Sequence, residues 1–233
     1  MSIQAGIWNL GGKPVDREVL ARIGQSEAEY APDGETIHVH GSAGMLYESF
    51  HTTVESRLER QPFVSASGKV FTWDGRLDNR HAMMGQIRNA LTDDITDVAI
   101  VAAAFERWGT DCFAKLIGDW AISILDTQNR ELILARDYIG VRHLFYYAMC
   151  DKILWCSHLA PLAKFAPQLS LCDDFFAGYL TLWPDAHLTP YQEIQSVPPG
   201  KFVRFTGDKI EICSHWIFNP KAKILYKTDA EIM

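Results

Sequence analysis

The chain begins Met1-Ser2-Ile3-Gln4-Ala5-Gly6-Ile7-Trp8, and this stretch decides how the fold starts. Apolar side chains alternate with smaller or polar ones, which predicts a strand over Ile3–Trp8. Ser2 stands directly before that strand. If Met1 is removed, Ser2 carries both a hydroxyl and a free amine, and a serine whose own amine acts as base is chemically able to cleave amides. The opening residues therefore supply a strand and a candidate nucleophile.

The rest of the chain is rich in strands and has a few amphipathic helices. Further strands are expected over Thr36–His40, Gly44–Glu48, Lys69–Trp73, Asp119–Leu125, Glu131–Ala135, Leu144–Ala148, Lys152–Cys156 and Phe202–Phe205. Helices are expected over Val15–Ile23, Asn79–Leu91, Thr96–Trp108, with Thr96 as N-cap, and Asp173–Leu182. Two adjacent helices between early and late strands indicate sheets that pack face to face and are covered by helices.

The composition is that of one compact domain. The chain has 233 residues, 48% of them hydrophobic and 22% charged, which is enough for a sizeable core. A net charge of −7 argues against a nucleic-acid or anionic-membrane partner. The five cysteines form no C-x-x-C pair and the eight histidines have no ligand spacing, so we expect reduced cysteines and no metal site. Since no signal peptide or membrane-length apolar run occurs, the expected location is the cytoplasm.

A series of motifs follows in a fixed order. They are Trp108-Gly109, Leu116-Ile117-Gly118-Asp119-Trp120-Ala121, Leu134-Ala135-Arg136-Asp137-Tyr138-Ile139-Gly140, Leu144-Phe145-Tyr146-Tyr147, Ser157-His158-Leu159-Ala160-Pro161-Leu162, Val197-Pro198-Pro199-Gly200, Trp216 and Asn219-Pro220. With the first strand, this succession resembles the amino-terminal class II glutamine amidotransferase domain of asparagine synthetases, whose relatives include β-lactam synthetases and lasso-peptide cyclases. The resemblance implies an α+β fold: a four-layer αββα sandwich of the N-terminal-nucleophile hydrolase type.

The resemblance covers residues 1–220, which are expected to form one glutamine amidotransferase type 2-like domain. Residues 221–233 resemble the start of a missing synthetase domain or a linker to it. The chain lacks the Ser-Gly-Gly-x-Asp-Ser loop with which the family's synthetase domain binds ATP. We therefore expect no cofactor in this chain, and ATP and Mg²⁺ only in the synthetase domain. That domain, in cis or as a separate chain, is the expected partner, and a homodimer is left open.

The resemblance also maps the family's glutamine site onto this chain. The family begins Met-Cys, and Ser2 stands where the nucleophilic Cys is expected. The Arg that pairs with the α-carboxylate of glutamine maps onto Ser49, within Met45–Phe50. A guanidinium binds a carboxylate through two charge-assisted hydrogen bonds, whereas a hydroxyl supplies one neutral donor. The implied carboxylate-binding group is therefore missing at Ser49.

The family's Asn-Gly-Glu motif is Asp74-Gly75-Arg76 here. In the family, the Asn amide and the Gly N–H form the oxyanion hole, and the Glu helps to bind the substrate ammonium. An ionised Asp74 only accepts hydrogen bonds, and losing one oxyanion donor costs roughly 3–4 kcal/mol. Arg76 would repel the ammonium by on the order of 4 kcal/mol. Only Asp97 keeps the family's acidic partner for that amine.

Two charged elements need a structural interpretation. A guanidinium in a former amino-acid pocket needs a counter-ion, so we expect Arg76 to point inward and lie within about 4 Å of Asp97 or Asp74. The pair Arg136-Asp137 ends an apolar strand. It is interpreted as an ion pair that supports the following turn and not as part of the site.

Ser2, Ser49, Asp74 and Arg76 thus all differ from the family in ways that oppose glutamine hydrolysis. This favours a degenerate glutaminase-like domain of an asparagine-synthetase-like, ATP-dependent amide-forming ligase, retained for its architecture. Two alternatives stay open. In one, Ser2 is a working nucleophile after Met1 removal and acts on a substrate other than glutamine. In the other, the chain is a free-standing binding or dimerisation module that holds an anionic small molecule through Arg76.

Overall fold

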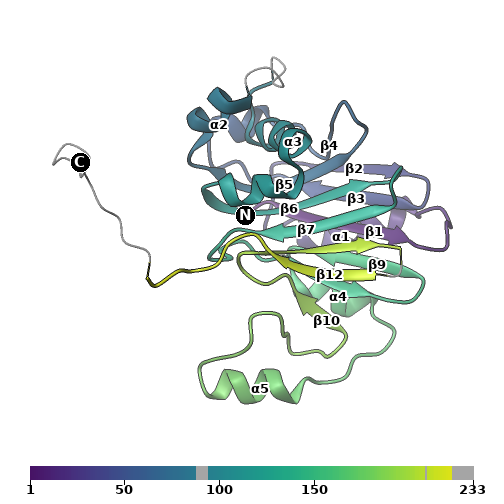
Figure 1. Ribbon diagram of the computed structural model, residues 1–233. Helices are drawn as coiled ribbons and strands as arrows, with labels where there is room; N and C mark the ends of the chain where they lie inside the picture. The colour runs from purple at the N-terminus through teal and green to yellow at the C-terminus, as the bar shows by residue number, and fades with distance from the viewer. Residues whose placement is uncertain (88–93, 208, 222–233) are drawn as a thin grey trace.

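Two antiparallel six-stranded sheets form the centre of the molecule, whose computed structural model describes residues 1–87, 94–207 and 209–221 (Figure 1). In the first sheet the strand order is β10-β8-β9-β1-β3-β2, and in the second it is β12-β11-β7-β6-β5-β4. Strand β1, the first of the chain, lies inside its sheet between β9 and β3. The start of the chain is therefore held on both sides by backbone pairing.

The elements of each layer come from distant parts of the sequence. The first sheet contains β1 (Ile3–Asn9), β2 (Glu35–His40), β3 (Ala43–Glu48), β8 (Phe145–Ala148), β9 (Lys152–Cys156) and β10 (Ile194–Ser196). The second contains β4 (Phe63–Val64), β5 (Val70–Leu77), β6 (Gly118–Asp126), β7 (Glu131–Arg136), β11 (Lys201–Thr206) and β12 (Lys209–Ser214). The helices are α1 (Arg17–Glu27), α2 (Arg80–Ile87), α3 (Asp97–Trp108), α4 (Leu159–Phe165) and α5 (Asp173–Leu180), with 3-10 turns η1 (Glu55–Leu58) and η2 (Gly109–Lys115).

Three apolar layers hold this arrangement together. Between the sheets lie Trp8, Met45 and Trp155 of the first sheet, packed with residues of the second such as Phe205. Helices α1 and α4 cover the outer face of the first sheet, and α2 and α3 cover the outer face of the second. Because successive side chains of a strand point to opposite faces, each sheet can contribute to two layers at once. The order of layers is αββα, which confirms the expected sandwich.

One buried polar side chain joins the two sheets. Gln4 of β1 is fully buried between them. Its Nε2 donates to the Ala121 carbonyl of β6 at 3.0 Å. Its Oε1 accepts from Thr72 Oγ1 of β5 at 2.9 Å and from Ser123 Oγ of β6 at 2.6 Å. These bonds engage both ends of the amide across the sandwich, so they fix how deeply β1 enters it.

The pair Arg136-Asp137 supports the turn that follows β7, as the sequence indicated, but mainly by hydrogen bonds to backbone groups. The Asp137 carboxylate accepts from the N–H groups of Trp120, Ile139, Gly140 and Val141 at 3.1, 2.8, 2.7 and 3.2 Å. The Arg136 guanidinium donates to the Arg142 and Val197 carbonyls at 2.6 and 2.7 Å, to Ser196 Oγ at 3.1 Å and to the Gly140 carbonyl. The segment from 137 to 142 is thereby held in one conformation.

Helix α5 stands apart from the two sheets (Figure 1). The excursion that carries it is closed at its base by a bridge between Leu171 and Tyr191, and Cys172 N–H donates to the Pro190 carbonyl at 2.9 Å. No residue of α5 is buried. Nearby Trp183 remains 86% exposed. The two ends of this segment are therefore joined by hydrogen bonds, while helix α5 contributes no residue to the core.

The expected strands and helices are confirmed, with shifted ends and some additions. Helix α2 begins at Arg80, and residues 88–91 of the expected helix lie outside the described residues. Thr96 is the N-cap residue of α3, but its side chain makes no capping bond. Glu59 accepts the N–H groups of Asp97 and Val98 instead. The sequence did not predict β4, β10, β12 and α4. In the described residues we find no helix of the length and apolarity that crossing a membrane requires.

A buried carboxyl group beneath α1 gives a pH-dependent prediction. Glu48 is 2% exposed, and in the described structure its Oε2 has no hydrogen-bond partner. Burial, followed by the charges of Glu35 and Glu27, raises the pKa of Glu48 to about 8. A raised carboxyl pKa means that the folded protein binds the proton more tightly than the unfolded chain does. The corresponding stability is complete below the unfolded pKa, near 4.5, and is lost as the pH rises through about 8.

We therefore expect Glu48→Gln to raise the free energy of unfolding by about 2 kcal/mol at pH 8.5, since it removes the cost of ionising a buried group. The gain should shrink toward pH 5, where the carboxyl group is protonated. Urea unfolding across this pH range measures it. Glu211→Gln, on an exposed strand, is the matched control and should show no such trend. A Glu48→Gln gain that is constant with pH would contradict the assignment.

Candidate active site

Ser2 lies between the two sheets, immediately before β1. It is 7% exposed, and its Oγ accepts a hydrogen bond from the Phe50 backbone N–H at 3.0 Å. The side chain of Tyr47, on the neighbouring strand β3, also lies near Ser2. Both residues come from the end of β3 that runs beside the start of β1. The structure thus places Ser2 between the sheets at the start of β1, with its Oγ already hydrogen-bonded.

Asp74 is a charged neighbour of the Ser2 backbone. Its side chain is buried between the sheets, and the nearby Ser2 backbone N–H acts to lower its pKa. Nη1 of Arg142 lies 3.8 Å from Asp74 Oδ1. Burial raises the pKa of Asp74 to about 6, and the charges of Arg142 and the chain's terminal amine oppose this rise. Above that pH the position predicted for an oxyanion donor is an anion that only accepts hydrogen bonds.

Gly75 is required by close packing. A Cβ at this position would lie 2.6 Å from Trp120 Cβ and 2.7 Å from the Asp119 carbonyl oxygen. Strand β5 approaches β6 so closely here that only glycine fits. The residue therefore has a structural reason to be glycine, and its role as an oxyanion donor stays a prediction.

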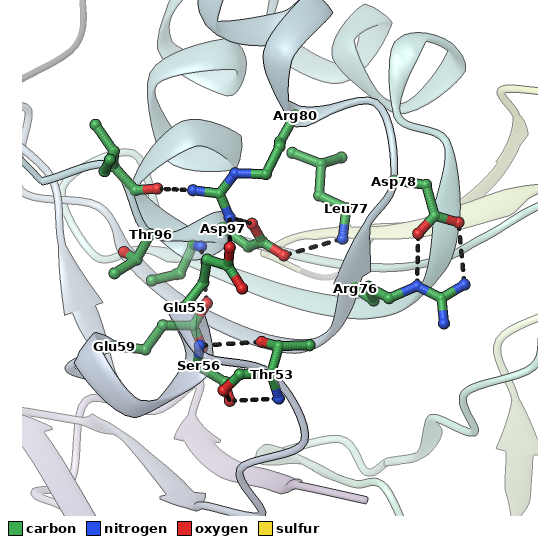
Figure 2. Close-up of polar contacts among 12 residues, drawn as sticks. Thr53, Glu55, Ser56, Glu59, Arg76, Leu77, Asp78, Arg80, Thr96 and Asp97 are labelled. Carbon is green, nitrogen blue, oxygen red and sulfur yellow. Dashed lines mark hydrogen bonds and ion pairs between the residues drawn. The ribbon is translucent and has the colours of Figure 1, made fainter.

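Asp97, at the start of α3, lies in a separate cluster (Figure 2). Its carboxylate accepts the Leu77 N–H at 3.0 Å and pairs with Nη1 of Arg80 at 2.7 Å. Arg80 also lies 3.8 Å from Glu55 and donates to the Ile95 carbonyl. Burial raises the pKa of Asp97, and the Leu77 N–H and Arg80 oppose this. The acid that would bind a substrate ammonium thus already has a guanidinium partner.

The expectation that Arg76 points inward is wrong. Its side chain is 53% exposed and pairs with Asp78, with Nε 2.5 Å from Oδ1 and Nη2 3.1 Å from Oδ2, and Asp119 lies 3.9 Å away. Figure 2 shows this pair directed away from Arg80 and Asp97. On β5, Arg76 shares the inter-sheet face with Asp74, whereas Asp97 belongs to α3 on the opposite face. Arg76 therefore cannot replace Arg80 as the partner of Asp97.

Ser49 follows β3 and is half-buried. Its backbone N–H donates to the Gly34 carbonyl at 2.8 Å, and its carbonyl accepts the Asp33 N–H at 3.0 Å. These bonds fix the segment that presents the Phe50 N–H to Ser2. The structure thus brings Ser2 together with Asp74 and the segment after Ser49, while Arg76 and Asp97 lie in other contacts.

The sequence missed three residues of this region: Tyr47, Arg80 and Arg142. Arg142 directly follows the turn that Arg136 and Asp137 support, and that position was the only local signal for it. Arg80 and Arg142 together do what was expected of Arg76, because each places a guanidinium against one of the two buried acids. Among the residues that the structure describes, no three His, Cys, Asp or Glu side chains are placed to hold a metal ion.

Stacked sheets with helices on both outer faces, and residue 2 between the sheets at the start of β1, are the architecture of the N-terminal-nucleophile amidotransferases. A family model described as a glutamine amidotransferase domain matches residues 2–216, and the chain belongs to that family. The expected class II glutamine amidotransferase resemblance is thereby confirmed.

Curated relatives of the chain carry the name asparagine synthetase. The chain is 21% identical over 226 residues to asparagine synthetase [glutamine-hydrolyzing] 2 of Bacillus subtilis, covering 91% of this chain and 30% of that protein. It is 24% identical over 166 residues to putative asparagine synthetase [glutamine-hydrolyzing] 2 of Methanocaldococcus jannaschii, covering 64% and 32%. The chain thus spans about a third of the length of these relatives.

A solved structure agrees on the fold. The glutamine phosphoribosylpyrophosphate amidotransferase of B. subtilis, complexed with ADP and GMP, superposes with a TM-score of 0.67. The alignment has 17% identity and covers 93% of this chain and 50% of that one. At this identity the likeness establishes the shared α+β sandwich.

Proposed function

We propose that this domain does not hydrolyse glutamine and serves as an architectural domain of an ATP-dependent amide-forming ligase. The observation that carries the proposal is the buried Asp74 carboxylate, which lies near the Ser2 N–H and 3.8 Å from Nη1 of Arg142. A tetrahedral intermediate at Ser2 would develop negative charge beside this anion. Exchanging a preorganised donor for an acceptor costs roughly 3–4 kcal/mol of transition-state stabilisation for the lost donor alone.

Two further contacts support the proposal. Asp97 is paired with Arg80 at 2.7 Å, so a substrate ammonium would have to displace a bound guanidinium. Ser49 offers a hydroxyl where the family's carboxylate-binding Arg is expected, and its backbone is fixed by the Gly34 carbonyl. Both ends of a glutamine backbone would thus lack their partners, and binding would be weak before chemistry begins.

The parent reaction belongs to the proposal as well. The relatives are longer proteins named asparagine synthetases, so we place residues 1–220 as a domain beside a synthetase domain that holds ATP and Mg²⁺, with residues 221–233 as its start or a linker. The reaction served would be asparagine formation with free ammonia, β-lactam closure or peptide cyclisation. We further propose that the protein is cytoplasmic. The synthetase domain would be its partner, either in cis or as a separate chain, and a homodimer is an alternative assembly.

Glutamate release from glutamine tests the central point. We expect the purified chain to release glutamate at the rate of a Ser2→Ala control, far below the ordinary enzyme range of about 1–1000 per second. Ser2→Cys should be equally inactive, because a nucleophile without its oxyanion hole and substrate contacts gains little. Turnover that disappears in Ser2→Ala would instead support the alternative in which Ser2 is a working nucleophile. An intact-mass measurement on the same sample shows whether Met1 is present.

A further inference from the structure

The position of the Ser2 backbone nitrogen has a consequence for the chain after Met1 removal. In the intact chain this nitrogen is an amide that lies near Asp74. Ser2 and Asp74 are both buried, and each is two residues from the hydrogen bond of 2.9 Å that joins Gln4 of β1 to Thr72 of β5. The Ser2 N–H accordingly lowers the pKa of Asp74. Pairing of Ile3 with Glu48 and the hydrogen bonds of Gln4 hold the start of β1 in place. Cleavage after Met1 would therefore leave the nitrogen where it is, but as a primary amine that carries a positive charge near neutral pH.

We propose that, once Met1 is removed, the carboxylate of Asp74 binds the α-ammonium group of Ser2 as a buried ion pair. A charged donor against a charged acceptor makes a stronger hydrogen bond than the amide it replaces. A buried carboxylate without a close cation is costly, so the ammonium also relieves part of the burial cost of Asp74. The inference deepens the proposed function and rests on it. An α-amine held as ammonium cannot accept the proton of the Ser2 hydroxyl, so Ser2 would lack the base that a nucleophile needs.

Other titratable groups surround Asp74 and Ser2, and some of them favour the ion pair while others oppose it. They are Arg142 from the turn after β7, His158 after β9, the phenol of Tyr47 on β3 and, beyond Tyr47, Glu59. Arg142 competes most directly, because its Nη1 lies 3.8 Å from Asp74 Oδ1. A carboxylate has two oxygens and about four acceptor positions, so it can serve both cations. The α-amine of Met1 in the intact chain is subject to the same opposing influences. Burial lowers the pKa of this amine, the charge of Asp74 raises it and the charge of Arg142 lowers it.

The test compares Asp74→Asn in two versions of the chain, one that retains Met1 and one released from a cleavable fusion so that it begins at Ser2. The amide introduced by this substitution can still accept a hydrogen bond, but it cannot form an ion pair. We expect the substitution to lower Tm by about 4 °C more in the chain that begins at Ser2. This difference should vanish above about pH 10, where the amine is neutral. Asp78→Asn is the control, since that carboxylate pairs with the exposed Arg76.

A second variant tests the ion pair independently, in case Asp74→Asn folds poorly. Arg142→Gln removes the competing cation and should raise the Tm of the Ser2-starting chain relative to the Met1-retaining chain. Equal effects of Asp74→Asn in both chains, or of Arg142→Gln in both chains, would overturn the ion pair. Neither result depends on glutamate release, so the ion pair can fail while the domain remains inactive toward glutamine, and the reverse also holds.

Discussion

Replacing Asp137 with Ala is expected to lower the free energy of unfolding by about 4 kcal/mol, a large share of the stability of an ordinary domain. The carboxylate is fully buried and accepts four backbone N–H groups, including that of Trp120 on β6. Each donor left without a partner in the interior costs about 1–3 kcal/mol. The buried guanidinium of Arg136 would also lose the neighbouring charge that helps to keep it ionised.

Chemical denaturation of the variant measures this loss directly. Asp111→Ala is a suitable control, because that carboxylate is exposed at the start of η2, and we expect its effect to stay within about 0.5 kcal/mol. If Asp137→Ala cost no more than about 1 kcal/mol, water would have to replace the carboxylate without strain, and the turn would not depend on Asp137.

The second large effect concerns Gln4. Gln4→Leu should destabilise the protein by about 3 kcal/mol, because the carbonyl of Ala121 and the hydroxyls of Thr72 and Ser123 would stay buried without their common partner. Thermal and urea unfolding are the measurements. Retention of wild-type stability would show that the two sheets do not need this polar connection.

A combined variant separates the two contributions to that loss. Gln4→Leu with Thr72→Val and Ser123→Ala removes the hydroxyl partners along with the amide, and the Ala121 carbonyl keeps its place in the ladder of β6. Replacing both sides of a buried hydrogen bond by apolar groups is close to neutral, so we expect the combined variant to be more stable than Gln4→Leu alone. A combined loss equal to the sum of the single substitutions would mean that the three side chains act independently.

The sequence predicted much of the sandwich because its central strands alternate clearly or are wholly apolar. Strand β9 was expected at its observed bounds, and β1 missed only Asn9. Strand β12 was not expected, although Ile210 and Ile212 alternate with polar residues. These two side chains lie on the inter-sheet face, opposite Phe205 and Val203, but at the edge of the sheet they stay 51% and 47% exposed. Their pattern therefore belongs to an edge and not to a core.

The site could be predicted only in part. The resemblance assigned Ser2 and Asp74 to one site, and the structure brings the two residues close together between the sheets, because the paired strands that carry them fix both positions. It could not choose the arginine that each buried acid would bind. That choice depends on a turn after β7 and on helix α2, which reach the acids through the tertiary fold. The mapping of the family's site favoured Arg76, whereas the structure supplies Arg142 and Arg80.

Helix α5 gives the domain room to evolve. Its excursion is closed at the Leu171–Tyr191 bridge, and its tip places no side chain in the core. Substitutions there carry little folding penalty, and changes in loop length add only slowly to the entropy of closure. Mutations can therefore accumulate on α5 while both sheets stay intact. Helix α5 is therefore a region in which the surface of the domain can change during evolution at little cost to its stability.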